Sequence, residues 1–278
     1  MVQLFHKVSE DCSKIVTENY STSFSSAIRL LHKDLRTPIH NIYGLVRFAD
    51  EIVDTFHEHD KSLLLNQFKQ ETYQAIQQGI SLNPVLNSFQ RTVNQYGIDL
   101  KLVDDFFLSM ELDLSKKIYT QKEYTEYVYG SAETVGLMCL YVFCEGNRDL
   151  FKELAPSARA LGSAFQKVNF LRDIKADYNG LSRIYFPGCD FNHFTEPQKK
   201  EIEEDIYQDF QNAYKGILNL PVKARFGVYV AYKYYFSLFK KIKKMKPAKV
   251  VEERIRIPDY KKLLLILRAR VKNQLRLI

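Results

Sequence analysis

The stretch RTPIHNIYGLVRFADEIVDTF, residues 36–56, indicates the fold class. Its apolar side chains recur every three or four residues, which is the period of an α-helix with one buried face. Thr37 followed by Pro38 is typical of a helix start, with Thr37 as the N-cap and Pro38 at the first helical position. Asp50 and Asp54 stand one turn apart on this helix. The stretch therefore predicts a core helix that carries either a solvated polar stripe or half of a metal site.

The same helical period continues along the chain, and no segment shows a convincing period-two strand pattern. The scarcity of glycine and proline, 11 and 8 in 278 residues, also favours long helices over many short strands. RIYFP, residues 183–187, is the best short extended candidate, and we expect a loop there. No linker separates two halves, so we predict one all-α domain over residues 1–278. The other predicted helices cover residues 4–19, 24–33, 61–79, 83–97, 99–114, 121–146, 155–178, 195–217, 220–245 and 257–278.

The N-terminus and the cysteines bear on the compartment. The first residues carry charges throughout and contain no apolar core of signal-peptide length. The longest apolar run, residues 137–144, is far shorter than the ~20 residues that a membrane span needs. The four cysteines show no metal-ligand spacing. We therefore expect a reduced, cytoplasmic protein without a transmembrane helix.

A second segment, FQKVNFLRDIKADYNGLSRIYFP at residues 165–187, repeats the aspartate spacing. Asp173 and Asp177 again lie one turn apart on one helix face. Both aspartate pairs have arginine and tyrosine neighbours. In the first segment these are Tyr43 and Arg47, which lie on the same helix face as the aspartates. The second segment adds Gln166, Asn169, Arg172, Arg183 and Tyr185.

Two facing carboxylate pairs suit magnesium. Mg²⁺ prefers oxygen ligands, keeps several waters, and is usually held by one or two carboxylates together with phosphate oxygens. Such ions would neutralise a diphosphate and make it a better leaving group, and Arg47, Arg172 and Arg183 would add fork-shaped donors to phosphate oxygens. The alternative is that these are surface carboxylates in ion pairs with Arg47, Arg172 and Lys175. That alternative is the better explanation for either motif alone, whereas the two motifs together favour the metal site.

Four segments of the chain, taken in order, resemble the squalene/phytoene synthase family. YGLVRFADEIVD (43–54) and QKVNFLRDIKADYNGLSRIYFP (166–187) resemble its two aspartate-rich motifs, STSFSSAIRLL (21–31) its N-terminal serine element, and YVYGSAETVGLMCLYVF (127–143) its central helix. The resemblance runs from about Ser21 to the C-terminus. It implies an all-α isoprenoid synthase fold around a central active-site cavity. It also implies a Mg²⁺-dependent head-to-head condensation of two prenyl diphosphates.

The resemblance also implies roles for individual residues. Asp50, Asp54, Asp173 and Asp177 correspond to the ligands of the Mg²⁺–diphosphate cluster. Tyr43 and Arg47, which we count with the catalytic residues, support them together with Gln166, Asn169 and Arg172. The expected diphosphate-contacting or cavity-lining positions are Ser21, Ser23, Phe24, Tyr127, Ala132, Val135, Arg183, Tyr185, Tyr235 and Arg254.

Three positions depart from the family pattern. Glu51 replaces the second aspartate of the common DDxxD motif, and Ala176 stands where the second motif often has an acid. Neither change removes an aspartate pair. Tyr20 stands where some members have histidine, which leaves the N-terminal diphosphate contact open.

Three functions remain as hypotheses. The first is a phytoene synthase of carotenoid biosynthesis, which joins two geranylgeranyl diphosphates through a cyclopropyl (prephytoene) diphosphate. Because RIYFP resembles phytoene-type members, no NADPH is expected. The second is a squalene or dehydrosqualene synthase that acts on two farnesyl diphosphates. The third is a catalytically inactive helical assembly factor with the same fold.

The C-terminal part of the chain is basic, since Lys and Arg far outnumber acids after residue 239. Leu264, Leu267, Val271, Leu275 and Ile278 recur there at helical spacing. This helix either packs into the core with a basic rim or contacts anionic lipid at the membrane surface. No recognised nucleic-acid motif accompanies the basic residues, so we expect no nucleic-acid partner.

Overall fold

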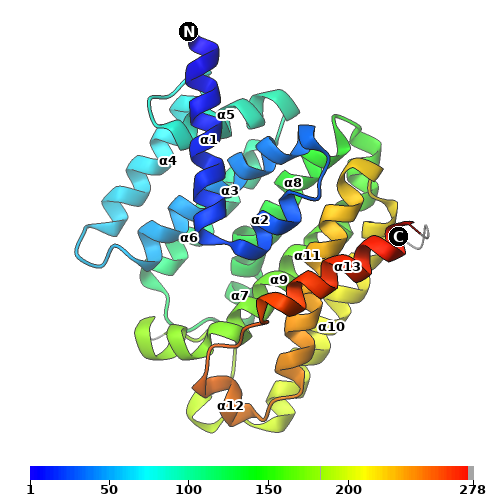
Figure 1. Ribbon diagram of the computed structural model, residues 1–278. Coiled ribbons are helices and arrows are strands. Elements are labelled where there is room, and N and C mark those ends of the chain that lie inside the picture. Colours follow the sequence, from blue (N-terminus) through cyan, green and yellow to red (C-terminus); the bar gives the residue numbers. More distant parts are fainter. Residues whose placement is uncertain (182, 275–278) are drawn as a thin grey trace.

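Helices make up nearly all the regular structure of the protein in the computed structural model, which describes residues 1–181 and 183–274 (Figure 1). Within this part of the chain no strand occurs, and the one extended contact is a bridge between Ile118 and Ile184. The all-α prediction is confirmed, whereas the single domain over residues 1–278 stays a prediction. The elements are α1 (Val2–Tyr20), α2 (Thr22–Ile28), α3 (Lys33–Asp54), α4 (Lys61–Gln78), α5 (Pro84–Tyr96), α6 (Leu100–Ser115), α7 (Gln121–Val128), η1 (Tyr129–Glu133), α8 (Thr134–Cys144), α9 (Arg148–Leu181), η2 (Phe191–His193), α10 (Glu196–Asn219), α11 (Val222–Lys243), α12 (Pro247–Glu252) and α13 (Asp259–Gln274).

Capping residues and glycine set the start or the end of several helices. The side chain of Asn83 accepts a hydrogen bond from the Val85 N–H at 3.1 Å, and Pro84 opens α5. Gly97 ends the same helix in the left-handed conformation, with φ of 60°, which glycine adopts without steric cost. Thr120 and Glu123 form a capping box at the start of α7. These boundaries follow from residues within one turn of each helix end.

Two helices begin three or more residues earlier than the sequence predicts. α3 starts at Lys33, so Thr37 is not its N-cap and Pro38 lies inside the helix. Leu35 is fully buried, and its packing draws the turn before Pro38 into the helix. α9 starts at Arg148 rather than near residue 155, because the Asn147 side chain accepts the Leu150 N–H at 3.0 Å. Tertiary packing and an N-terminal cap thus override the expected proline boundaries.

The centre of the molecule is built around α8 and α9, with α3, α6, α10 and α11 packed around them (Figure 1). The close approach of η1 and α8 to α9 depends on glycine. A Cβ on Gly162 would lie 2.5 Å from the Ala132 carbonyl oxygen, and one on Gly136 would lie 2.8 Å from the Ala158 carbonyl oxygen. The helix backbones therefore meet almost directly at this point.

A π-helical turn, η1, joins α7 to α8, and the sequence did not predict it. Such turns shift the face that the following residues present and are frequent at functional sites. Here Ser131 and Ala132 in the turn, and Val135 just after it, line the central cavity described below.

In the described part of the chain, one helical run, Gln121–Cys144, is long and apolar enough to cross a membrane by length and composition. The sequence-based expectation considered only the shorter run at residues 137–144. In the structure 61% of the most apolar window is buried inside the protein, as in a central core helix.

The last helix, α13, differs from the core-packing interpretation. Leu264, Leu267 and Val271 are 47%, 48% and 55% exposed, so they do not belong to the core. The opposite face of α13 packs on the protein instead, where Ala269 is 3% exposed. Leu275 and Ile278 lie outside the described residues.

Candidate active site

A cavity of about 1170 Å³ lies between α2, α3, α8, α9 and α11. It is lined by every residue that the sequence analysis proposed for the site, with the exception of Arg183. Residues 254–258, the segment before α13, border it as well. Segments far apart in the sequence thus meet around one space.

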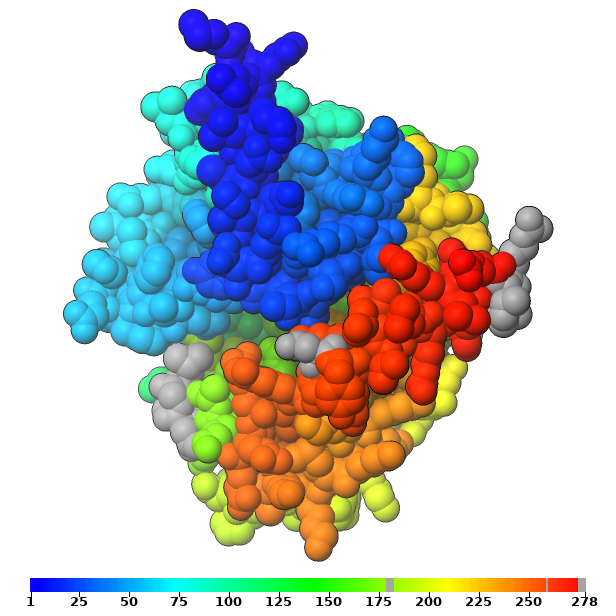
Figure 2. All heavy atoms as spheres, in the orientation of Figure 1, coloured from blue at the N-terminus to red at the C-terminus, as the bar shows by residue number. Residues whose placement is uncertain are grey.

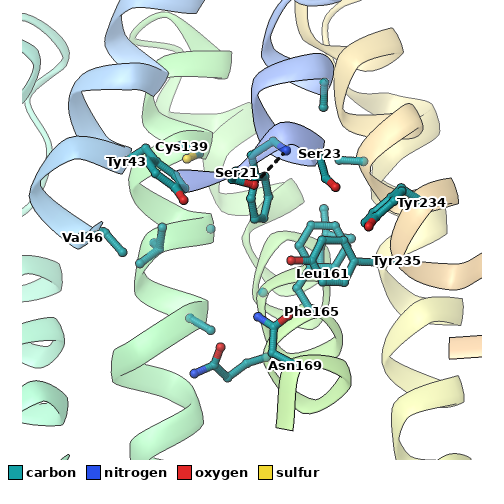
Figure 3. A pocket seen from close by; sticks show the side chains of 18 of the residues that line it. Ser21, Ser23, Tyr43, Val46, Cys139, Leu161, Phe165, Asn169, Tyr234 and Tyr235 are labelled. Atoms are coloured by element: carbon teal, nitrogen blue, oxygen red, sulfur yellow. Dashed lines mark hydrogen bonds between the residues drawn. The ribbon is translucent and has the colours of Figure 1, made fainter. Parts of the chain in front are cut away.

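The α2 side of the cavity is rich in rings and hydroxyl groups (Figure 3). The Phe165 and Tyr235 rings stack with centroids 3.9 Å apart, and the Phe24 ring lies 5.7 Å from Tyr235 and 6.0 Å from Tyr43. The Ser21 hydroxyl accepts the Phe24 N–H at 3.2 Å and so caps α2. This part of the cavity presents apolar ring faces next to a few hydroxyls.

The two aspartate pairs lie on the cavity wall on separate helices, Asp50 and Asp54 on α3, Asp173 and Asp177 on α9. Burial raises the pKa of Asp50 to about 8, and the charge of Asp54 adds to this. Burial also raises the pKa of Asp177 to about 7, with repulsion from Asp173 and then from Asp54. The influence of Asp54 on Asp177 shows that the pairs interact electrostatically across the cavity.

Asp173 lies between two guanidinium groups. Arg172 Nε donates to its Oδ2 at 3.0 Å, and Arg254 Nε lies 2.8 Å from its Oδ1. Burial lowers the pKa of Arg172, but the hydrogen bond to Asp173 and the charges of Tyr235 and Asp173 together outweigh this, so the net pKa is raised. Arg254 lies 81 positions after Asp173 in the sequence, and the fold brings it to the second aspartate motif.

Among the described residues, Arg47 forms no hydrogen bond or ion pair with either aspartate of its own motif, although its charge acts to lower the pKa of Asp50. It forms an ion pair with Glu51, and its guanidinium lies 4.4 Å above the centre of the Tyr20 ring. Arg47 Nε and Asn169 Oδ1 are buried cavity-lining atoms without a hydrogen-bond partner. Unsatisfied buried polar atoms are rare and costly, so both fit a site that receives a polar ligand.

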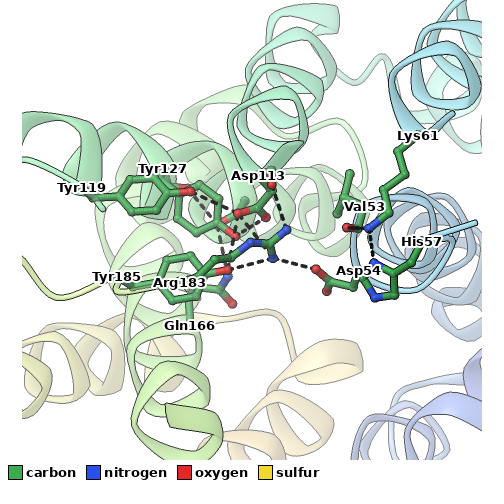
Figure 4. A network of polar contacts seen from close by, with 11 residues as sticks. Val53, Asp54, His57, Lys61, Asp113, Tyr119, Tyr127, Gln166, Arg183 and Tyr185 are labelled. Atoms are coloured by element: carbon green, nitrogen blue, oxygen red, sulfur yellow. Dashed lines mark hydrogen bonds and ion pairs between the residues drawn. The ribbon is translucent and has the colours of Figure 1, made fainter. Parts of the chain in front are cut away.

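A network around Asp113 of α6 was missed by the sequence analysis (Figure 4). Asp113 accepts hydrogen bonds from the hydroxyls of Tyr127 at 2.6 Å, Tyr119 at 3.1 Å and Tyr185 at 3.4 Å. Arg183 donates through Nη2 to the Asp113 carbonyl oxygen at 2.8 Å, and through Nη1 to Asp54 Oδ1 at 2.7 Å. Arg183 is thus a support behind the cavity wall that holds an aspartate of the first motif.

The position of Asp113 offers a signal that could have identified it. It follows Phe106 and Met110 at helical spacing, so it occupies a core position on α6, and all three are buried. A carboxylate on the buried face of a helix needs partners. Burial raises the pKa of Asp113 to about 6, while Arg183 and the Tyr127 hydroxyl act in the opposite direction.

The donor set suits a hard divalent cation shared with a ligand. Among residues 1–181 and 183–274, no group of three or more His, Cys, Asp or Glu side chains gathers at one point. A cation at either aspartate pair would therefore complete its shell with water and ligand oxygens, as Mg²⁺ usually does. The raised pKa values of Asp50 and Asp177 fit this arrangement, because a cation would relieve their repulsion.

Comparison with known proteins agrees with this geometry. The family model for squalene/phytoene synthase matches residues 17–261. The 4,4'-diapophytoene synthase of Staphylococcus haemolyticus is 28% identical over 200 residues, which is 71% of this chain and 68% of that protein. The phytoene synthase of Arthrospira platensis is 27% identical over 288 aligned positions, covering 92% of each chain.

The fold also agrees with a solved structure. A dehydrosqualene synthase in complex with ligand superposes with a TM-score of 0.82 at 18% identity, over 97% of this chain and 98% of that one. At this level of identity the superposition shows the isoprenoid synthase fold. With the family model matched over most of its length, the chain belongs to the squalene/phytoene synthase family, whose members are prenyltransferases.

Proposed function

We propose that the protein is a phytoene synthase, which condenses two geranylgeranyl diphosphates head to head with Mg²⁺. The observation that carries this proposal is the pairing of carboxylates from α3 and α9 on one cavity whose wall also includes many apolar side chains. Carboxylates suit a metal–diphosphate cluster, and the apolar wall suits prenyl chains.

The aspartates would bind the metal, and the arginines hold the aspartates in position. Asp50 and Asp54 on one wall, with Asp173 and Asp177 on the other, would hold Mg²⁺. The bound metal would neutralise the diphosphates and assist their departure. Arg172 and Arg254 orient Asp173, and Arg183 orients Asp54.

The aromatic wall serves the cationic stage of the reaction. When the first diphosphate leaves, an allylic cation forms, and the double bond of the second substrate attacks it. Loss of a proton to the released diphosphate then closes the ring of the cyclopropyl diphosphate. Phe24, Phe165 and Tyr235 offer π faces to such a cation, worth up to ~2 kcal/mol or more when desolvated. Ala132 and Val135 add apolar lining that excludes water.

The twenty-carbon substrate is supported by the phytoene synthase relative, which aligns over nearly the whole of both chains. The 4,4'-diapophytoene synthase relative has almost the same identity over a shorter alignment. That similarity favours the alternative, a dehydrosqualene or squalene synthase with the fifteen-carbon substrate. The four aspartates argue against an inactive assembly factor, in which their loss is expected.

One incubation series separates these functions. The purified full chain is mixed with Mg²⁺ and either geranylgeranyl or farnesyl diphosphate, with and without NADPH, and the extracted hydrocarbon is identified by mass spectrometry. We expect phytoene from the twenty-carbon substrate without NADPH, and none in the presence of a chelator. Coupling of farnesyl diphosphate alone would establish the alternative. Release of neither hydrocarbon nor diphosphate would refute both enzymatic functions.

A further inference from the structure

The helix α13 has an apolar face that the described part of the protein leaves uncovered. Tyr260, Leu264, Leu267 and Val271 follow one another at intervals of four, three and four residues, which places them along one side of the helix. All four are exposed, and so is Leu263, which lies beside them. We call these five residues the outer stripe. A contiguous exposed apolar surface of this kind marks an interaction site.

The opposite face of α13 attaches the helix to the protein. Ala269 is buried, and Ile266 packs against the core. Lys262 Nζ donates to the Thr22 hydroxyl at 3.2 Å and lies 5.5 Å from the centre of the Tyr234 ring. Figure 2 shows α13, in red, at the surface beside the N-terminal helices in blue. Because this inner face alone docks the helix, folding does not explain the leucines of the outer stripe.

Positive charge borders the outer stripe on both sides. Helical spacing places Lys261, Arg268 and Lys272 along one edge and Arg270 along the other, and all four are exposed. No acidic residue follows Asp259 in the chain.

The neighbouring helix α11 extends this positive surface. Burial lowers the pKa of Lys233, and the charges of Lys272 and Lys240 lower it further. The ammonium group of Lys233 is therefore close enough to be repelled by Lys240 on its own helix and by Lys272 on α13. Such a surface attracts anions.

We propose that the outer stripe docks on the surface of an anionic lipid bilayer. Its leucines would enter the headgroup region, while the basic edges meet lipid phosphates. A second copy of the chain fits the stripe less well, because two-fold pairing would bring identical basic edges together.

Docking through α13 would place the cavity next to the bilayer, and the value of this placement rests on the proposed function. Residues 254–258, directly before α13, line the cavity. Docking would therefore hold the cavity close to the bilayer, into which prenyl chains and a hydrocarbon product partition.

The test uses the full chain and measures co-sedimentation with vesicles, which requires no catalysis. One set of vesicles is pure phosphatidylcholine, and the other contains equal parts of phosphatidylcholine and phosphatidylglycerol. We expect binding to the anionic set only, and weaker binding at high salt. The double variant Leu264→Ser/Leu267→Ser should bind the anionic vesicles with an affinity reduced by roughly tenfold or more. Its matched control is Leu82→Ser/Leu108→Ser, which changes two exposed leucines outside α13 and should bind as the parent does.

Further measurements keep the result interpretable. Thermal unfolding should be unchanged in the stripe variant, and so should turnover of detergent-dispersed substrate, so a failed enzyme assay would not affect the vesicle result. Equal binding by the stripe variant and the parent would overturn the proposal, as would equal binding to both vesicle sets. Size-exclusion chromatography that shows a dimer dissociated by the stripe variant, with vesicle binding intact, would identify a second copy as the partner instead.

Discussion

Arg183 and Asp54, 129 positions apart in the sequence, are joined by a hydrogen-bonded ion pair of 2.7 Å. The second aspartate of the first motif is thus held by an arginine that follows the second motif. Arg183 is only 6% exposed, and its other terminal nitrogen is anchored on the carbonyl oxygen of Asp113. The segment that follows the second motif therefore supports the first motif.

Arg183→Lys should slow turnover by about tenfold to a hundredfold. Lysine keeps the charge but cannot donate in two directions from one plane, so Asp54 and Asp113 would no longer be bridged. A charge-assisted hydrogen bond contributes about 1.5–3 kcal/mol, which corresponds to that range. Steady-state kinetics would measure the change. Arg36→Lys is the control, because Arg36 is exposed in the first turn of α3, where it donates to the Leu31 carbonyl, and this variant should retain the parent rate.

Asp113→Asn should lower the free energy of unfolding by about 1–3 kcal/mol, because an amide offers one acceptor oxygen in place of two and leaves at least one of the tyrosine hydroxyls without its acceptor. We also expect a lower kcat with little change in KM, since Asp113 does not contact the diphosphates in this proposal. Denaturant titration and kinetics would measure both. Asp104→Asn, on the exposed side of the same helix, should change stability by only about 0.5 kcal/mol. A variant with parent stability and kcat would contradict the supporting role of Asp113.

Asp50→Asn and Asp173→Asn should each reduce turnover by at least about a hundredfold, because each removes a carboxylate from a metal-binding pair. Asp11→Asn, at an exposed ion pair on α1, serves as the control and should be neutral. Mass-spectrometric quantification of the hydrocarbon would give the rates. Near-normal turnover in either cavity variant would disprove its assignment as a metal ligand.

The metal-free protein should become less stable as the pH rises. The carboxyls of Asp113, Asp177 and Asp50 have pKa values of about 6, 7 and 8 in the folded protein, above the ordinary value of 3.8. A raised folded-state pKa means that the native protein binds more protons than the unfolded chain between the two values. Stability therefore falls as the pH increases from about 4 through these values.

Thermal unfolding between pH 5 and 8 would measure this trend, for which we expect a falling Tm. Mg²⁺ with inorganic diphosphate should raise the Tm most at the alkaline end, where the carboxylates are ionised. Asp50→Asn should flatten the upper part of the curve. A Tm that increases steadily with pH in the absence of metal would show that these carboxyls are not perturbed as the structure indicates.

Much of the molecule can be read from local sequence. The spacing of apolar residues every three or four positions identifies the helices, because the hydrophobic effect favours burial of one apolar stripe on each helix. Asp50 with Asp54, and Asp173 with Asp177, are visible because their spacing on one helix follows from helix geometry alone. The order of the motifs was sufficient for the family resemblance, which the family model confirms. What the sequence by itself determined is therefore the set of helices and the faces they carry.

Only the tertiary structure decided which faces meet. The pairing of Arg183 with Asp54, and of Arg254 with Asp173, depends on how whole helices pack, and no local pattern encodes it. The spacing of Asp113 with Phe106 and Met110 indicates a core position, but only the fold supplies its three tyrosine partners. The leucines of α13 have the spacing of a core helix, yet α11 and α2 cover its other side. Burial is a property of the assembled surfaces, so periodicity predicts that a face exists but not what covers it.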